Sequence, residues 1–240
     1  MINKIAIIMA MREEAKPIIE HFNLLPTKDL FDQQLPMEVY SNSNIFIILN
    51  GKDPIYHVES IGTQSAVITT LSVIQKIQPD LIINAGTAGG FAKRGGKIGE
   101  VYSAKSGVCF HDKRIPLGDY AAMGLGNYNC LEIPNLSQKL GLKQGVVTTG
   151  NSLDIIETDE KIIDSYKGEL KDMEAAAIAM ICQFYNMPLI ILKSITDIVD
   201  GPHPIHEEFM ENLELASHNL KEKCQQLIHE IQGKTIDQVN

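Results

Sequence analysis

The sequence predicts an α/β fold made of a single domain, with a central mixed β-sheet flanked by helices. Short apolar runs rich in Ile, Leu and Val alternate with amphipathic or Ala-rich segments, an order typical of sheets covered by helices. The 240 residues suffice for one large core, and no linker or internal repeat divides them. We therefore expect one domain over residues 1–232 and a loose, polar tail over residues 233–240.

The expected elements follow from the pattern of apolar residues. Residues 4–9 form a continuous apolar run typical of a buried strand, and residues 12–21 place Ala15, Ile18 and Ile19 among charges, as a helix would. Further strands are expected at 45–49, 81–84, 101–104, 146–149 and 189–195. Further helices are expected at 62–77, 160–166, 174–185 and, at the end, 205–231.

Composition excludes several classes of function. The 21 basic and 30 acidic residues give a net charge of −9, which disfavours binding to nucleic acid or to an anionic membrane. No apolar run approaches the roughly 20 residues of a membrane helix. Four cysteines without C-x-x-C spacing indicate reduced thiols, and the seven histidines form no metal-ligand pattern. We expect a cytoplasmic protein with no metal and no cofactor.

A glycine-rich segment follows the strand expected at 81–84. It has the sequence Asn84-Ala85-Gly86-Thr87-Ala88-Gly89-Gly90. Glycines at a strand end let the backbone turn sharply and approach a ligand closely. The spacing matches neither the dinucleotide-binding fingerprint nor a P-loop, so a purely structural turn is an equal alternative.

Acidic residues lie where buried strands meet helices. Glu14 is in the first turn of a helix after a strand, and Asp197 follows the strand at 189–195, positions at which α/β folds bind ligands. Asp172 and Glu174 precede the Ala-rich helix, where they could instead stabilise its N-terminus. Asp197 could likewise cap the next segment, although its position favours a site acid.

Five motifs, taken in order, resemble the 5′-methylthioadenosine nucleosidase family of the nucleoside phosphorylase superfamily. The match runs from residue 4 to about residue 232, and the stretches 110–116 and 200–201 most resemble plant-type members. The motifs are Ala10-Met11-Arg12-Glu13-Glu14, the glycine-rich segment, Thr149-Gly150-Asn151-Ser152-Leu153-Asp154, Asp172-Met173-Glu174-Ala175 and Thr196-Asp197.

The resemblance implies a three-layer sandwich and a hydrolase that acts on a small-molecule adenine nucleoside. It further implies methionine salvage, a homodimer, and cleavage of 5′-methylthioadenosine to adenine and 5-methylthioribose. Such a reaction must protonate a poor leaving group, activate water and stabilise a cationic sugar, and three carboxylates can divide that work.

The family's residue roles carry over by motif. By resemblance, Asp197 protonates adenine N7, Glu14 activates the water, and Glu174 beside Met173 binds the ribose hydroxyls. A carboxylate on those hydroxyls binds more strongly as positive charge grows on the sugar. The supporting positions are Met11 at the sugar, Thr87, Ala88 and Gly89 along the base and ribose, the backbone of Leu153 and Asp154 at the adenine edge, and Thr196 beside the acid.

Two alternatives stay open at this point. A phosphorylase of this fold would need positive charge for phosphate; the family's phosphorylases carry Arg just before the glycine-rich segment, where this chain has Asn84-Ala85. A non-catalytic storage or binding relative would not need all three carboxylates. Asn151 stands where relatives usually have Asp, and residues 117–128 are expected to shape the alkylthio pocket across the dimer interface. The sequence does not decide whether S-adenosylhomocysteine is also a substrate.

Overall fold

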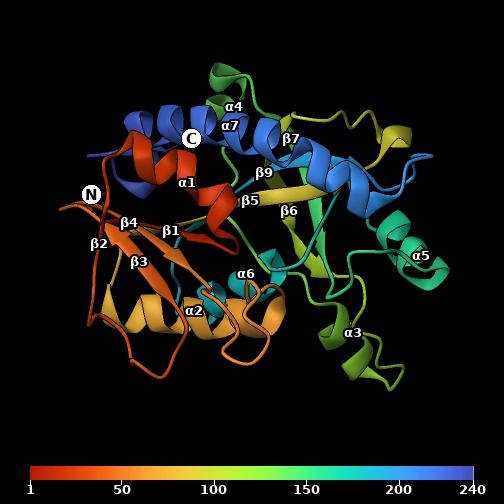
Figure 1. Cartoon of the computed structure of the whole chain (residues 1–240). Helices are drawn as coiled ribbons and strands as arrows, with labels where there is room; N and C mark the ends of the chain where they lie inside the picture. The colour runs from red at the N-terminus through yellow and green to blue at the C-terminus, as the bar shows by residue number, and fades with distance from the viewer. Residues whose placement is uncertain (240) are drawn as a thin grey trace.

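A nine-stranded mixed sheet runs through the part of the chain that the computed structural model describes, residues 1–239 (Figure 1). The strands are β1 (Ile5–Met9), β2 (Leu25–Pro26), β3 (Glu38–Ser41), β4 (Ile45–Leu49), β5 (Leu81–Gly90), β6 (Val101–Phe110), β7 (Lys143–Thr149), β8 (Leu170–Asp172) and β9 (Leu189–Ile198). The helices are α1 (Arg12–His21), α2 (Thr63–Lys76), α3 (Asp119–Leu125), α4 (Pro134–Leu140), α5 (Glu157–Ser165), α6 (Ala175–Phe184) and α7 (Ile205–Ile231).

Half of the sheet closes on itself. The strand order is β2-β3-β4-β1-β5-β8-β7-β6-β9, and β9 also pairs with β5. Strands β1, β4, β5 and β9 are parallel to their neighbours in this group, whereas β8 is antiparallel to β5 and β9 is antiparallel to β6. The expected mixed sheet is confirmed, and the closed ring formed by β5, β8, β7, β6 and β9 is a feature that the sequence did not predict.

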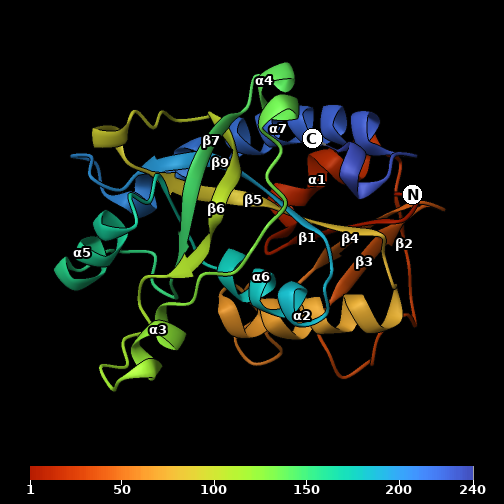
Figure 2. The same cartoon turned by 180° about the vertical axis from the view of Figure 1, so that it is seen from behind.

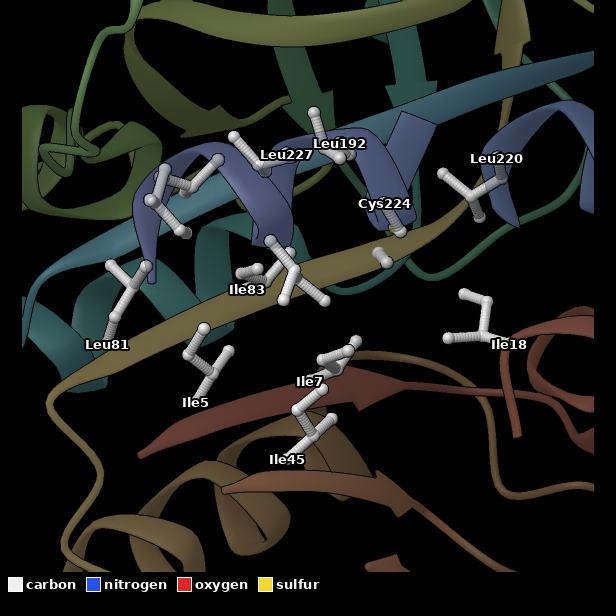
Figure 3. Packing of buried hydrophobic residues seen from close by; sticks show 14 of the residues in the cluster. Ile5, Ile7, Ile18, Ile45, Leu81, Ile83, Leu192, Leu220, Cys224 and Leu227 are labelled. Carbon is white, nitrogen blue, oxygen red and sulfur yellow. The ribbon is translucent and has the colours of Figure 1, made fainter. Parts of the chain in front are cut away.

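Helices cover both faces of the sheet, in agreement with the expected layers. Helices α1 and α7 lie on one face and α2 and α6 on the other (Figures 1 and 2). The side chains of β1 point alternately to the two faces of the sheet, so Ile5 and Ile7 pack in one core while Ala6 and Ile8 pack in the other. Figure 3 shows the first core, in which Ile83 of β5 packs among residues of α7 and its neighbours.

The glycine-rich segment is not the turn that we expected. Strand β5 continues through it to Gly90, and its residues pair in register with β9 apart from a shift between Ala88 and Gly89. None of Gly86, Gly89 and Gly90 has a positive φ. The glycines serve close approach instead, since a Cβ on Gly89 would lie 2.7 Å from Asp197 Oδ2.

The expectation of a loose tail is wrong for the described residues after 232. Gly233 N donates to the Ile2 carbonyl and Ile2 N donates to the Lys234 carbonyl, which joins the two ends of the chain. Val239 is buried in the core that Ile2 also enters. The polar composition concealed this packing because one buried valine and a short 3₁₀ turn at Ile236–Gln238 are enough to hold the segment.

Two helices lie away from the central layers. Helices α3 and α5 stand out from the body of the molecule on the side of the closed ring (Figures 1 and 2). Both follow strands of that ring, after β6 and β7 respectively. Within residues 1–239, no helix is long and apolar enough to cross a membrane.

Candidate active site

A cavity of about 560 Å³ opens where β1 ends and where the second halves of β5 and β9 run side by side. Its volume lies within the range of small-molecule sites. Ten of the eleven predicted site residues line it, and only Asp154, which is exposed, does not. The ten are Met11, Glu14, Thr87, Ala88, Gly89, Leu153, Met173, Glu174, Thr196 and Asp197.

Glu14 is held in one orientation by the strand that faces it. Its Oε1 accepts hydrogen bonds from Thr87 N at 2.8 Å and from Thr87 Oγ1 at 2.6 Å. Its Oε2 accepts a longer bond, 3.3 Å, from Met11 N, so the carboxylate also closes the first turn of α1. The side chain is 3% exposed although it carries a carboxyl group. The fold therefore fixes an acidic group at the cavity wall.

The two acidic residues before α6 take different roles. Asp172 stabilises the start of α6, since its Oδ2 accepts hydrogen bonds from the amides of Glu174, the N-cap residue, and Ala175 at 3.2 and 2.8 Å. Glu174 faces the cavity, and its Oε1 accepts a hydrogen bond of 2.8 Å from Gly62 N, at the start of α2. The helix-stabilising explanation is correct for Asp172 and does not account for Glu174.

The buried Lys193 compensates the negative charge of Asp172. Lys193 Nζ lies 2.8 Å from Asp172 Oδ2, and both side chains are almost completely inaccessible. Burial alone would raise the pKa of Asp172, but the charge of Lys193 and the hydrogen bonds outweigh it, so that pKa lies below its usual value. Burial and the negative charges of Asp172 and Glu14 instead raise the pKa of Glu174 to about 7, against the opposing charge of Lys193.

Asp197 occupies the far wall of the cavity. It is 3% exposed, and burial raises its pKa above the usual value for an aspartate. Thr196 Oγ1 donates to its Oδ1 at 2.8 Å, which fixes the orientation of the carboxyl group. The register shift between β5 and β9, at which Thr196 is the extra residue, places Gly89 opposite Asp197, and the missing side chain of Gly89 leaves room for the carboxyl group.

Asn151 connects the loop after β7 to the start of α2. Its Oδ1 accepts hydrogen bonds from Thr63 N and Thr63 Oγ1, both at 2.9 Å. Its backbone N and Nδ2 donate to Asp112 Oδ2 at 2.7 and 3.2 Å. The amide thus supplies both a donor and an acceptor, which an ionised Asp at this position could not do. The neighbouring Gly62 N holds Glu174, so this contact supports the acidic wall.

Several cavity residues had no recognisable signal in the sequence. Phe209 reaches the cavity from α7, and His57, Val58 and Ile61 reach it from the loop before α2. Lys171 of β8 also lines it. None of them lies in a motif with a strand end, a glycine-rich pattern or paired acids. Within the described residues, no group of three or more His, Cys, Asp and Glu side chains is arranged to hold a metal ion.

We predict that Glu174 makes the ligand-free protein less stable as the pH rises. A carboxyl group with a pKa of 4.5 in the unfolded chain and about 7 in the folded state favours folding only while it stays protonated. Its contribution is present below pH 4.5 and is lost as the pH passes 7. Glu174→Gln should therefore increase the free energy of unfolding by about 2 kcal/mol at pH 8, and by much less at pH 5. Denaturant unfolding at both pH values measures this, and equal effects at the two would contradict it.

We predict that Asn151→Asp destabilises the protein and that Asp112→Asn restores it. The substitution removes the Nδ2 donor and places a second carboxylate against Asp112. The expected loss in the free energy of unfolding is about 1–2 kcal/mol. In the double variant, an amide at 112 donates to the carboxylate at 151. Denaturant unfolding of both variants decides this, and a single variant as stable as the wild type would show that the contact carries no energy.

Comparisons with known proteins agree with this geometry. The Phosphorylase superfamily matches residues 4–229. A 5′-methylthioadenosine/S-adenosylhomocysteine nucleosidase of Arabidopsis thaliana is 41% identical over 98% of this chain and 94% of its own. The structure of the Arabidopsis thaliana 5′-methylthioadenosine nucleosidase superposes with a TM-score of 0.96 at 37% identity, covering 99% of both chains. A second structure, of an MTA/SAH nucleosidase, also gives 0.96, at 40% identity and 99% coverage of both. This chain therefore belongs to the phosphorylase superfamily and, within it, to the 5′-methylthioadenosine nucleosidase family.

Proposed function

We propose that the protein hydrolyses the N-glycosidic bond of 5′-methylthioadenosine, releasing adenine and 5-methylthioribose. One observation carries the proposal: Glu14, Glu174 and Asp197, from three separate elements, are all buried and all line one cavity. Burial of a carboxyl group is costly unless it is paired or kept neutral, so three at one cavity indicate a chemical task. The named activity of the Arabidopsis relatives supports the same reaction.

Asp197 is the general acid in this proposal. Its raised pKa keeps it protonated at a higher pH than an exposed aspartate, so it holds a proton that it can donate to N7 of adenine. Protonation turns adenine into a better leaving group. Thr196 holds Oδ1, which directs the other oxygen of the carboxyl group, Oδ2, toward the donor position.

Glu14 and Glu174 act on the sugar side. The bonds from Thr87 and Met11 fix the Glu14 carboxylate, so it can orient a water and accept its proton as the water attacks the anomeric carbon. Glu174 faces the same space and accepts hydrogen bonds from the ribose hydroxyls. Because its pKa is near 7 in the empty cavity, developing positive charge on the sugar favours its ionised form, which stabilises the transition state more than the ground state.

The surrounding charges favour water over phosphate as the nucleophile. Lys193 is already paired with Asp172, so its charge is not available to a bound anion. Glu14 and Glu174 would repel a phosphate in the same space. A phosphorylase needs positive charge that is free to bind phosphate beside the sugar. Another buried lysine at the cavity, Lys171, donates to the carbonyls of Ser152 and Leu153, and the side chains that we assign to the sugar are carboxylates.

The apolar side of the cavity suits a methylthio group. Met11, Met173, Val58 and Phe209 line it, and we propose that 5′-methylthioadenosine is preferred over S-adenosylhomocysteine, whose longer chain is zwitterionic. Side-by-side turnover of the two nucleosides tests this preference. We place the activity in methionine salvage, as the reaction that removes this nucleoside.

We further propose that the protein works as a homodimer in the cytoplasm. Exposed apolar side chains gather on the loop before α2 and around α3, a pattern that marks protein interfaces. They include Ile55, Tyr56 and Val58 on the loop and Leu117, Tyr120 and Met123 near α3. Four free thiols, three of them buried, suit a reducing compartment.

The proposal predicts that turnover is independent of phosphate. In phosphate-free buffer, 5′-methylthioadenosine should yield equal amounts of adenine and 5-methylthioribose, and added phosphate should change neither the rate nor the products. Chromatography of the sugar product measures this directly. Phosphate-dependent formation of a sugar 1-phosphate would instead assign the protein to the phosphorylases.

Asp197→Asn should abolish most of the activity, because an amide cannot donate a proton to N7. We expect kcat to fall by about 10²–10⁴-fold while the fold persists, since Thr196 can still donate to the amide oxygen. Asp164→Asn, on exposed α5, is the matched control and should keep the wild-type rate within about twofold. A kcat in Asp197→Asn close to that of the control would show that Asp197 is not the acid.

A further inference from the structure

Lys171 is a second buried ammonium at the cavity, and none of the roles proposed for Glu14, Glu174 and Asp197 involves it. It lies in the middle of β8, is 5% exposed and lines the cavity. Unlike Lys193, it forms no ion pair within 4.0 Å among residues 1–239. Placing an ammonium in such a site costs several kcal/mol unless hydrogen bonds and charges compensate for it. Its contacts therefore indicate what the charge is for.

The ammonium fastens a loop to the sheet. Lys171 Nζ donates to the backbone carbonyls of Ser152 and, at 3.1 Å, Leu153. These two residues belong to the segment between β7 and α5, whose Leu153 lines the cavity. With its carbonyls directed toward Lys171, the segment has its backbone orientation set beside the cavity. The proposed function places the adenine edge against this same backbone.

Lys171 and Asp197 lie on either side of Gly89, a residue without a side chain, in the sheet. Gly89 is paired with Lys171 on one side, in β8, and with Asp197 on the other, in β9. Side chains of residues paired in this way project from the same face of a sheet. Gly89 has no side chain to separate them, and a Cβ there would collide with the Asp197 carboxyl group. The positive charge of Lys171 therefore acts directly on Asp197, and it lowers the pKa of that acid against the effect of burial.

We propose that Lys171 is a positioning residue that holds the base-reading loop in register with Asp197 and stabilises the carboxylate left when that acid gives up its proton. The proposal rests on the proposed function for the identity of the base. One ammonium performs both tasks because the loop carbonyls and the acid lie on either side of it. A neutral side chain of the same length would leave both carbonyls without a donor and the new carboxylate without a counter-charge.

The test compares Lys171→Met with Lys105→Met. The Lys105 ammonium pairs with Glu169 and takes no part in the cavity, so this variant controls for the loss of one positive charge. We expect Lys171→Met to lower kcat about tenfold or more and to weaken adenine binding, measured by calorimetry, while Lys105→Met changes neither beyond about twofold. The alkaline limb of the kcat/KM profile should move to higher pH in Lys171→Met, because Asp197 loses the charge that lowers its pKa.

A merely structural role would lower stability without moving that limb. If Lys171→Met fails to fold, its pH profile cannot be measured, and Lys171→Ala then tests the role of the ammonium. Ethylammonium chloride should restore part of the kcat of Lys171→Ala. Tetramethylammonium chloride at equal ionic strength should not. An unshifted limb in a folded variant, or equal effects of the two salts, would overturn the proposal. Wild-type protein that binds adenine but fails to cleave the nucleoside would refute the proposed function instead, and adenine affinity in Lys171→Met would still test the loop.

Discussion

The site depends on one buried ion pair, between Lys193 Nζ and Asp172 Oδ2 at 2.8 Å. The Asp172 carboxylate also accepts hydrogen bonds from Thr149 Oγ1 of β7 and from the first amides of α6. One carboxylate therefore joins β7, β8, α6 and β9 beneath the cavity. Breaking such a pair on one side leaves an uncompensated buried charge, which costs about 3–5 kcal/mol. The positive charge of Lys193 also attracts the carboxylates of Glu174 and Glu14. It therefore limits the mutual repulsion of Asp172, Glu174 and Glu14.

The glycines of β5 differ in what their missing side chains permit. A Cβ on Gly86 would lie 3.5 Å from Lys193 Nζ and 3.6 Å from Glu14 Oε1, which are ordinary contact distances, so a small side chain would fit there. A Cβ on Gly89 would lie 2.7 Å from Asp197 Oδ2, which is closer than a real Cβ comes. The segment that resembles a ligand-binding turn is thus a strand in which the missing side chain of Gly89 leaves room for the Asp197 carboxyl group.

Much of the fold could be predicted because its strongest signals are local. The apolar run of β1 and the long amphipathic α7 have bounds close to those expected from their patterns. The ends of β5 and β9 could not be predicted, because Gly, Asn and Asp are poor strand formers and only the pairing of the two segments makes them strand. Closure of the ring depends on contacts between distant strands, which no local pattern encodes.

In the candidate site, too, the residues with local sequence signals could be predicted and those placed by tertiary contacts could not. Glu14, Glu174 and Asp197 could be predicted as candidates because each stands near a strand end or a helix start within a motif of a known family, and all three line the cavity. Phe209 and Val58 could not, because they enter the cavity from a helix face and a loop that only the tertiary structure brings there. Lys171 was overlooked because the sequence shows a lysine in a short strand, and burial beside an acid becomes visible only in three dimensions.

The most direct test of the proposed mechanism is a crystal structure of the protein with a non-hydrolysable analogue of 5′-methylthioadenosine. We expect Asp197 within hydrogen-bond distance of the N7 position, Glu174 on the ribose hydroxyls, and a water between Glu14 and the anomeric carbon. A base placed against Glu14, or an ordered anion in the position of that water, would contradict it.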